Sequence, residues 1–411
     1  MEERIVITGM GAVTAVGHTV KENWENITAG VSGVGPITAF DAGEFLVQIA
    51  AEVKDFDPSK YLPARDIRRR DRFELMAAAA VGEALDQSGL EIKEENADRI
   101  GVVLSSAIGG ITSLEEAILT VDQDGPRRVS PFAIPMLMAN GAAGLAGIDH
   151  GIRGPAFSVA SACASGQDGI GMAWMMLKSG MVDAAVCGAS EATIRPMAVA
   201  AFDRMGAMSR RGLDQAAPTP FDLNRDGLVM GEGAGILVLE RESTARARDA
   251  EILAELAGYS ASADSYHITA PSKTGAGGAR AMMRAIESAG LEPSDIGYIN
   301  AHGTGTPLND ASETLAVKTC FGEDAYNVPI SSTKSMTGHM MGATGAVETI
   351  LCVQAIRENV VPPTINYQTP DPDCDLDVVP NEARDHKVDA AITNSFGFGG
   401  HNAVLVVKAY S

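Results

Sequence analysis

The sequence predicts a layered α/β fold in which helices cover most of the sheet surface. Short runs of β-branched apolar residues alternate with longer segments of helical periodicity, as in α/β proteins. The chain has 411 residues, more than one domain usually contains, and 45% of them are hydrophobic. Two distant segments also resemble each other, which favours an internally duplicated protein.

In the first half of the chain, the expected strands are short and rich in Val, Ile and Ala. They cover residues 4–8, 100–104, 156–159, 184–187 and 235–239. Segments in which apolar residues recur every three or four positions are expected to be helices. These helices cover residues 73–87, 113–121, 166–178 and 243–250. Strand and helix thus follow each other in the order that builds α/β layers.

The second half of the chain repeats this scheme. Its expected strands and helices cover residues 252–260, 278–289, 298–301, 329–332, 345–357, 390–394 and 403–408. Residues 158–180 and 330–359 each combine a short strand, a turn of small residues and an apolar helix. No low-complexity linker separates the halves. We therefore divide the chain into an N-terminal half, residues 1–251, and a C-terminal half, residues 252–411.

The composition narrows the range of functions. The formal net charge is −21, and a strongly acidic protein binds nucleic acid or anionic membranes poorly. No run of about 18 apolar residues is present, so no transmembrane helix is expected. The five cysteines are widely spaced and form no C-x-x-C pair. This pattern indicates free thiols in a reducing cytoplasm, with no disulfide framework and no zinc site.

Cys163 is the first candidate for chemistry. It lies in VASACASG, residues 159–166, between an expected strand and an expected helix. This placement predicts a thiol on a tight turn at a helix N-terminus, where the helix dipole and free N–H groups lower its pKa. The same N–H groups can hold an oxyanion. The alternative is a buried thiol with a packing role, because free cysteine is among the most buried residue types.

His302 is the second candidate. It lies in NAHGTGT, residues 300–306, directly after an expected strand. Functional side chains of α/β proteins gather at the carboxyl ends of strands. The two glycines of this segment let the backbone approach a ligand, and Thr304 and Thr306 offer hydroxyls. A structural, hydrogen-bonding histidine is the alternative.

A third segment, SSTKSMTGHMMGATG at residues 331–345, places Lys334 and His339 before an expected helix. A lysine in such an apolar, glycine-rich context has an expected electrostatic role, although an ordinary surface charge is the alternative. A buried lysine needs an acidic partner, and Glu313 and Glu348 are the candidates.

The fourth segment, NSFGFGGH at residues 394–401, places Phe396 and Phe398 among glycines. A mobile aromatic gate whose backbone N–H points into the site is the functional interpretation. A tight β-turn with incidental aromatic residues is the alternative.

Together these segments resemble the elongating β-ketoacyl-acyl-carrier-protein synthases, the type II condensing enzymes of the dissociated fatty-acid system. The resemblance extends from VITGMGAVTAVG through ACASG, FDLNRDGLVMGEGAG, NAHGTGTPLND and KSMTGHMMGATGAVE to NSFGFGGHN. It implies a thiolase-like duplicated fold, a five-layer αβαβα sandwich, in a homodimer. The implied reaction is a decarboxylative Claisen condensation of malonyl-acyl-carrier protein with an enzyme-bound acyl group, giving 3-oxoacyl-acyl-carrier protein and CO2.

The resemblance also implies the roles of the catalytic residues. Cys163 corresponds to the nucleophile that accepts the acyl chain. His302 and His339 correspond to the two histidines that promote decarboxylation. Lys334 corresponds to a lysine in an electrostatic role, with Glu313 as its expected partner.

Further positions correspond to the substrate-binding parts of the family. The N–H groups of Cys163 and Phe398 correspond to the oxyanion hole, and Phe398 also to the gate. The expected contacts of the acyl chain and of the pantetheine arm are Thr304, Thr306, Ile108, Phe202 and Phe396. Structural support is expected from Glu313, Glu348 and Asn394. Asn300, Glu348 and Asn394 also resemble a monovalent-cation or ordered-water site of some relatives. No cofactor is implied, because the 4'-phosphopantetheine arrives on the carrier protein.

The expected partner is a small acidic carrier protein, which an acidic chain can bind only through a local basic patch. The densest basic clusters are RDIRRRDR at residues 65–72 and the pair at residues 127–128. The expected docking residues are Arg68, Arg69, Arg127 and Arg128. The alternative is ion pairing within the chain, since Asp66 and Asp71 are interleaved with the arginines.

Related classes fit the sequence less well. A thiolase uses a second cysteine near its C-terminus, where this chain has NSFGFGGHN. An initiating synthase has one histidine and one asparagine where this chain has His302 and His339. A silent chain-length factor lacks the nucleophile, and a specialised decarboxylase is disfavoured because Cys163 is present. A polyketide or polyunsaturated-chain synthase uses the same three residues and stays open. One departure is His401, where many relatives have Thr.

Overall fold

The computed structural model describes residues 3–215 and 217–411. Its N-terminal half contains strands β1 (Ile5–Val13), β4 (Ile100–Ser105), β5 (Ala156–Phe157), β6 (Ala184–Glu191) and β7 (Gly233–Arg241). The C-terminal half contains β8 (Ala254–Ala263), β9 (Tyr298–Asn300), β10 (Ile330–Ser331), β13 (Ala390–Gly397) and β14 (His401–Lys408). Every expected strand is present, most with extended ends.

The helices follow the same division. The N-terminal half contains α1 (Val20–Thr28), α2 (Ala64–Ile67), α3 (Arg72–Ser88), α4 (Ile111–Asp124), α5 (Ala133–Leu137), α6 (Gly141–His150), α7 (Ser165–Lys178), α8 (Pro196–Arg204) and α9 (Glu242–Ala247). The C-terminal half contains α10 (Ala276–Ser288), α11 (Pro307–Phe321), α12 (Lys334–Thr337) and α13 (Thr344–Glu358). The sequence predicted α3, α4, α7, α9, α10 and α13, but no helix was expected at α1, α2, α5, α6, α8, α11 or α12.

The strand order shows that the fold is duplicated. The large sheet has the order β10-β9-β13-β14-β8-β1-β7-β6-β4-β5. From the outer edge of the sheet to its centre, the strands of the two halves therefore follow the same order. In each half the outer two pairs of strands are parallel and the inner two pairs are antiparallel. The halves join where β1 runs antiparallel to β8, with Val6 opposite Glu255.

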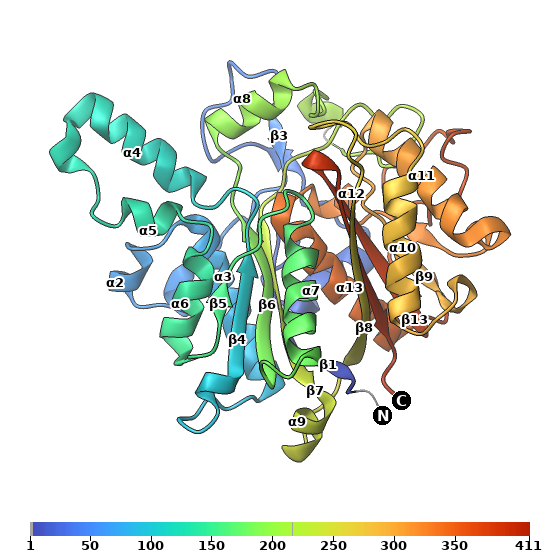
Figure 1. The fold of residues 1–411 in the computed structure, drawn as a ribbon. Coiled ribbons are helices and arrows are strands. Elements are labelled where there is room, and N and C mark those ends of the chain that lie inside the picture. The colour runs from blue at the N-terminus through green and yellow to red at the C-terminus, as the bar shows by residue number, and fades with distance from the viewer. Residues whose placement is uncertain (1–2, 216) are drawn as a thin grey trace.

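Three apolar cores separate the layers. One core joins α3 and α6 to β4, β6 and β7. A central core places α7 and α13 between strands of both halves, and a third joins α10 and α11 to β9, β13 and β14. Figure 1 shows α7 and α13 in the middle, with α3 and α6 on one side and α10 and α11 on the other. The predicted five-layer αβαβα arrangement is confirmed.

The topology brings the four candidate segments to one end of the sandwich. Cys163 precedes α7, and His302 follows β9. Lys334 begins α12 after β10, and His339 lies between α12 and α13. Phe398 lies in the connection between β13 and β14.

Short paired strands complete the chain: β2 (Gly35–Pro36) with β3 (Ile49–Ala50), and β11 (Val360–Val361) with β12 (Arg384–Asp385). Within the described residues, every helix is too short or too polar to cross a membrane.

Candidate active site

Cys163 lies on a strained turn before α7. Ala162 adopts a φ of 52°, in the left-handed region that costs a residue with a Cβ about 1–2 kcal/mol. The turn packs against Gly397, where a Cβ would lie 3.0 Å from the carbonyl oxygen of Ser161 and 3.1 Å from the Cys163 nitrogen. Glycine at position 397 therefore permits this approach. The thiol is buried but not sealed, with 8% of the residue exposed.

The predicted lowering of the Cys163 pKa is wrong. Burial raises the pKa of the thiol to about 11, although the Phe398 N–H, the Lys334 charge and the Cys163 N–H each act to lower it. Desolvation outweighs these contributions because the thiolate loses its water shell in the cavity. The N–H groups of Phe398 and Cys163 lie close enough to Sγ to lower its pKa. This is the arrangement expected of an oxyanion hole.

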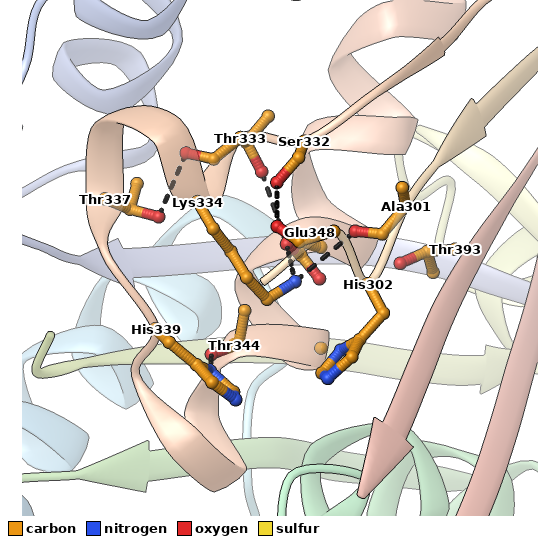
Figure 2. A network of polar contacts seen from close by, with 12 residues as sticks. Ala301, His302, Ser332, Thr333, Lys334, Thr337, His339, Thr344, Glu348 and Thr393 are labelled. Carbon is orange, nitrogen blue, oxygen red and sulfur yellow. Dashed lines mark hydrogen bonds and ion pairs between the residues drawn. The ribbon is translucent and has the colours of Figure 1, made fainter. Parts of the chain in front are cut away.

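His302 and His339 face Cys163 from the C-terminal half. One ring nitrogen of each histidine and the Cys163 Sγ all lie within 4.8 Å of one another. The two imidazoles meet edge to face, with ring centroids 5.3 Å apart and planes at 84°. The Nδ1 atom of His339 lies 3.1 Å from the Thr344 hydroxyl, as Figure 2 shows. When this hydroxyl donates to Nδ1, the proton of the neutral ring is on Nε2.

Burial keeps both histidines neutral. It lowers the pKa of His302 well below its ordinary value, and the charge of Lys334 lowers it further. The same two causes lower the pKa of His339 to about 3. Neutral imidazoles can donate an N–H to a carbonyl oxygen without carrying a charge into the cavity.

Lys334 pairs with Glu348, and the expected pairing with Glu313 is wrong. The Lys334 Nζ lies 2.7 Å from Glu348 Oε1 and 3.3 Å from the carbonyl oxygen of Ala301 (Figure 2). Their side chains are 2% and 1% exposed. Glu313 instead accepts the backbone N–H groups of His302 and Gly303, at 2.8 and 2.7 Å. Glu313 thus holds the histidine loop, and Glu348 neutralises the lysine.

Replacing Glu348 by Gln should destabilise the protein. The Lys334 ammonium would stay buried without a carboxylate, and breaking a buried pair costs about 3 kcal/mol or more. Urea denaturation should therefore show a loss of about 3 kcal/mol in the free energy of unfolding. Glu358→Gln, at the exposed end of the same helix, is the matched control and should change little. A loss below about 1 kcal/mol for Glu348→Gln would contradict a charged pair.

A cavity of about 300 Å³ opens onto the three reactive side chains. Thr304 and Thr306 lie in its wall with their hydroxyls 2.9 Å apart. Phe202 and Phe398 stack over it, with ring centroids 6.0 Å apart. Phe396 also lines the cavity, whereas Ile108 is outside its lining and is 37% exposed. Lining residues that the sequence analysis missed include Leu228, Thr269, Pro271, Leu308, Asn309 and Met341.

Several polar atoms of His302 and of the expected support residues are buried without a described partner. They are both side-chain polar atoms of Asn300, Nδ1 of His302, Oε2 of Glu348 and Oδ1 of Asn394. Buried oxygens of this kind normally bind a water or an ion. The oxygens of Asn300, Glu348 and Asn394 therefore fit the donor set expected for ordered water or a monovalent cation.

The sequence analysis also missed Asp168, which supports the nucleophile turn. Its carboxylate accepts the Ser161 hydroxyl on one oxygen and the Tyr259 hydroxyl, at 2.7 Å, on the other. Tyr259 belongs to β8 of the other half and packs against Gly171, where a Cβ would lie 2.4 Å from its ring. The QDG sequence after ACASG was the available signal, because it places an acid in the first turn of the expected helix, where the helix N-terminus stabilises a negative charge.

Asp168→Asn should slow the acylation of Cys163. An amide offers one acceptor where two hydroxyls now donate, so the turn loses part of its support. We expect the acylation rate to fall about tenfold, because small displacements of a reacting group are costly. The rate is measured by quenching the acylation reaction at successive times and determining the acylated fraction by mass spectrometry. Tyr259→Phe removes one of the two bonds and should have a smaller effect. An unchanged rate in Asp168→Asn would show that the network has no positioning role.

The four arginines expected to dock the carrier protein are all exposed. Arg68 ends α2, and Arg69 lies 4.6 Å above the ring of Phe132, beside α5. Arg127 and Arg128 lie within the connection between α4 and α5, whose place Figure 1 shows. The interleaved acids have other partners, since Asp66 pairs with Arg65 and Asp71 caps α3. None of the docking arginines lines the cavity.

The fold and the site define a condensing enzyme that transfers acyl groups through a cysteine. "Beta-ketoacyl synthase, N-terminal domain" matches residues 2–245, and "Beta-ketoacyl synthase, C-terminal domain" matches residues 253–368. The chain belongs to the β-ketoacyl synthase family.

Named relatives agree with this membership. The chain is 47% identical over 410 residues to 3-oxoacyl-acyl-carrier-protein synthase 2 of Synechocystis sp., covering 100% of this chain and 99% of that protein. It is 48% identical over 408 residues to the protein of the same name from Staphylococcus aureus, covering 99% of both. Two solved structures match over the full length of both chains. A ketosynthase in complex with its type II PKS acyl-carrier protein has a TM-score of 0.92 at 34% identity, and an ishigamide ketosynthase/chain length factor has 0.93 at 36%.

Proposed function

We propose that the enzyme elongates fatty acids by decarboxylative Claisen condensation of malonyl-acyl-carrier protein with an acyl group on Cys163. The observation that carries this proposal is the approach of one thiol and two neutral imidazoles to within 4.8 Å in a single buried cavity. The relatives named synthase 2 support fatty-acid elongation over polyketide synthesis, because they are more similar to this chain than the polyketide ketosynthase is.

Acylation of Cys163 is the first step. The sulfur attacks the thioester carbonyl of the incoming acyl-carrier protein, and the oxyanion is held by the N–H groups of Cys163 and Phe398. The carbon–sulfur bond to the pantetheine then breaks. The thiol proton ends on the departing pantetheine sulfur, so the exchange of thioesters is balanced.

Decarboxylation supplies the carbanion in the second step. The N–H groups of His302 and His339 donate to the thioester oxygen of malonyl-carrier protein as CO2 leaves, which stabilises the enolate. The Thr344 contact fixes the His339 tautomer for this donation. Lys334, neutralised by Glu348, contributes to the low pKa values that keep both rings uncharged.

Condensation completes the cycle. The enolate carbon attacks the acyl carbonyl on Cys163, and the same two N–H groups hold the second oxyanion. The new carbon–carbon bond forms as the carbon–sulfur bond breaks, and Cys163 takes up one proton from solvent. The products are 3-oxoacyl-acyl-carrier protein and a free thiol.

Substrate contacts follow from the cavity wall. Thr304 and Thr306 present hydroxyls to the amides of the pantetheine arm. Phe202 and Phe396 provide apolar contacts to the acyl chain, and Phe398 closes the passage as the gate. Ile108 lies outside the lining of this cavity and is exposed, so we assign it no contact with the acyl chain.

Arg68, Arg69, Arg127 and Arg128 form the proposed docking surface for the acidic carrier protein. Arg68→Glu combined with Arg127→Glu should raise KM for carrier-bound substrate about tenfold with kcat nearly unchanged, because exposed charges mainly affect encounter. Steady-state kinetics at low and high salt provide the measurement, and salt should reduce the difference. Arg284→Glu on α10 is the matched exposed control. An unchanged KM at low salt would contradict this surface.

We also propose a homodimer that covers the face around β5. This strand ends the sheet and is paired, among the described residues, only with β4. Figure 1 places α4, α5 and α6 on the same side. Their exposed apolar side chains are Ile118, Leu119, Val121, Ile134 and Ile148. Sedimentation should give a particle of twice the 42.7-kDa chain.

Two smaller proposals concern the surroundings of the site. The oxygens of Asn300, Glu348 and Asn394 bind an ordered water or a monovalent cation that stiffens the histidine loops.

The enzyme acts in the cytoplasm, which fits five cysteines that are all free and buried.

Product analysis tests the proposed reaction. The purified enzyme is incubated with an acyl-carrier protein and isotopically labelled malonyl-carrier protein. We expect a 3-oxoacyl-carrier protein two carbons longer than the acyl substrate, with one CO2 for each product. An acyl exchange without a longer product would contradict the proposal.

A further inference from the structure

We propose that the acyl-free enzyme binds one Zn²⁺ ion between Cys163, His302 and His339, and that this ion reversibly blocks acylation. The sulfur and one nitrogen of each ring lie within 4.8 Å of one another. The three residues are 8%, 3% and 2% exposed, so the donors form one enclosed group. The inference concerns a ligand that the condensation does not use, and it stands independently of the proposed function.

The donors match the chemistry of zinc. Thiolate sulfur and imidazole nitrogen are its usual ligands, and three protein ligands with one open position are typical of accessible zinc sites. Ligand atoms on tetrahedral Zn²⁺ lie about 3.3–3.8 Å apart, from bond lengths of about 2.0–2.3 Å. The three donors must therefore close by up to about 1.5 Å, which requires rotation of their side chains. The cavity of about 300 Å³ leaves room for a water as the fourth ligand.

The surroundings orient one of the two rings for a metal. A metal-binding imidazole is usually held through its other nitrogen, as His339 Nδ1 is by the Thr344 hydroxyl. His302 Nδ1 is buried without a partner among the described residues, so no carboxylate or carbonyl there orients this ring. The charge of Lys334 acts on both rings and on the thiol and so disfavours a cation here, and the Glu348 carboxylate at 2.7 Å offsets part of it.

Coordination changes the reactivity of the enzyme. As the sulfur–zinc bond forms, the thiol proton is released to solvent, and the sulfur lone pair needed for attack is occupied. An acyl group on Cys163 removes the thiolate ligand, so the acyl-enzyme should not bind the ion. Zinc would therefore inhibit only the free enzyme, before Cys163 is acylated. A chelator would restore activity.

Calorimetric titration of the full-length, metal-stripped enzyme with zinc chloride tests the proposal. We expect one site per chain, with affinity reduced well over tenfold in Cys163→Ala, His302→Ala and His339→Ala, because loss of even a residue that orients a metal ligand costs about 10–100-fold. His401→Ala, an exposed histidine outside this group, should bind as the unmodified enzyme does. Absence of binding, or binding unchanged in Cys163→Ala, would overturn the proposal and reveal at most a surface-bound ion.

A second measurement avoids relying on variants that fold poorly. Wild-type enzyme loaded with an acyl group should lose the zinc site, and zinc should protect the free enzyme from alkylation of Cys163 by iodoacetamide. Magnesium, a hard cation that prefers oxygen ligands, should give no protection. Equal zinc binding by free and acyl-loaded enzyme would also overturn the proposal. Since these measurements use no malonyl substrate, their failure leaves the proposed condensation untouched.

Discussion

His302→Ala and His339→Ala should each lose most of the malonyl decarboxylation while keeping acyl transfer to Cys163. Each imidazole supplies one N–H to the developing enolate oxygen, and removal of one such donor costs about 10²–10³ in rate. The sulfur and the backbone oxyanion groups remain in both variants. Release of CO2 from labelled malonyl-carrier protein measures the loss, and intact-mass analysis measures the acylation that persists.

His386→Ala is the control for this pair, because His386 lies outside the cavity lining and should decarboxylate normally. The double variant should lose little beyond the worse single variant, since the two donors act on one oxygen. In the unmodified enzyme, the rate should show no titration near pH 6.5, because burial keeps both rings neutral. Decarboxylation that survives in both single variants would show that their roles are misassigned.

Cys163→Ala should abolish condensation, with a fall of at least about 10³ in the rate of 3-oxoacyl product formation. The other four cysteines are buried, and none lines the cavity, so no described thiol can replace it. His302 and His339 keep their positions, and we expect some decarboxylation without product. A chromatographic assay of 3-oxoacyl-carrier protein provides the measurement.

Cys320→Ala is the matched control for the loss of a buried thiol outside the site, and it should condense normally. Product formation by Cys163→Ala at a rate near that of the unmodified enzyme would contradict the role of this residue.

The local patterns predicted most of the fold. Buried strands such as β4 and β6 are short apolar runs, and α7 and α13 follow small-residue turns, so periodicity located them closely. Helix α11 was not predicted, because it is buried on several sides and its sequence shows no single apolar face. Its start was nevertheless marked, since Thr306 caps the helix and Pro307 occupies the first turn.

The missed helix explains the wrong partner for Lys334. Glu313 on α11 and Glu348 on α13 are both buried acids near the lysine. Without the position of α11, the sequence could not show that Glu313 lies under the histidine loop, where two backbone N–H groups already satisfy it. Helix α13 instead presents Glu348 directly to the ammonium group. Distances between helices of different layers are a tertiary property that local periodicity does not contain.

The direction of the Cys163 pKa shift was predicted wrongly for a related reason. The turn before α7 predicted N–H groups and a helix end around the thiol, and the N–H groups of Phe398 and Cys163 do face it. The depth of the cavity depends on loops from both halves, which the local sequence does not reveal. Burial therefore decides the sign of the shift.

Intact-mass analysis after incubation with acyl-carrier protein shows directly whether Cys163 carries the acyl chain. We expect one acyl adduct on the unmodified enzyme and none on Cys163→Ala, with His302→Ala still acylated. The adduct should disappear when malonyl-carrier protein is added, because the chain leaves as the 3-oxoacyl product. An acyl adduct that persists on Cys163→Ala would contradict the claim that this cysteine holds the growing chain.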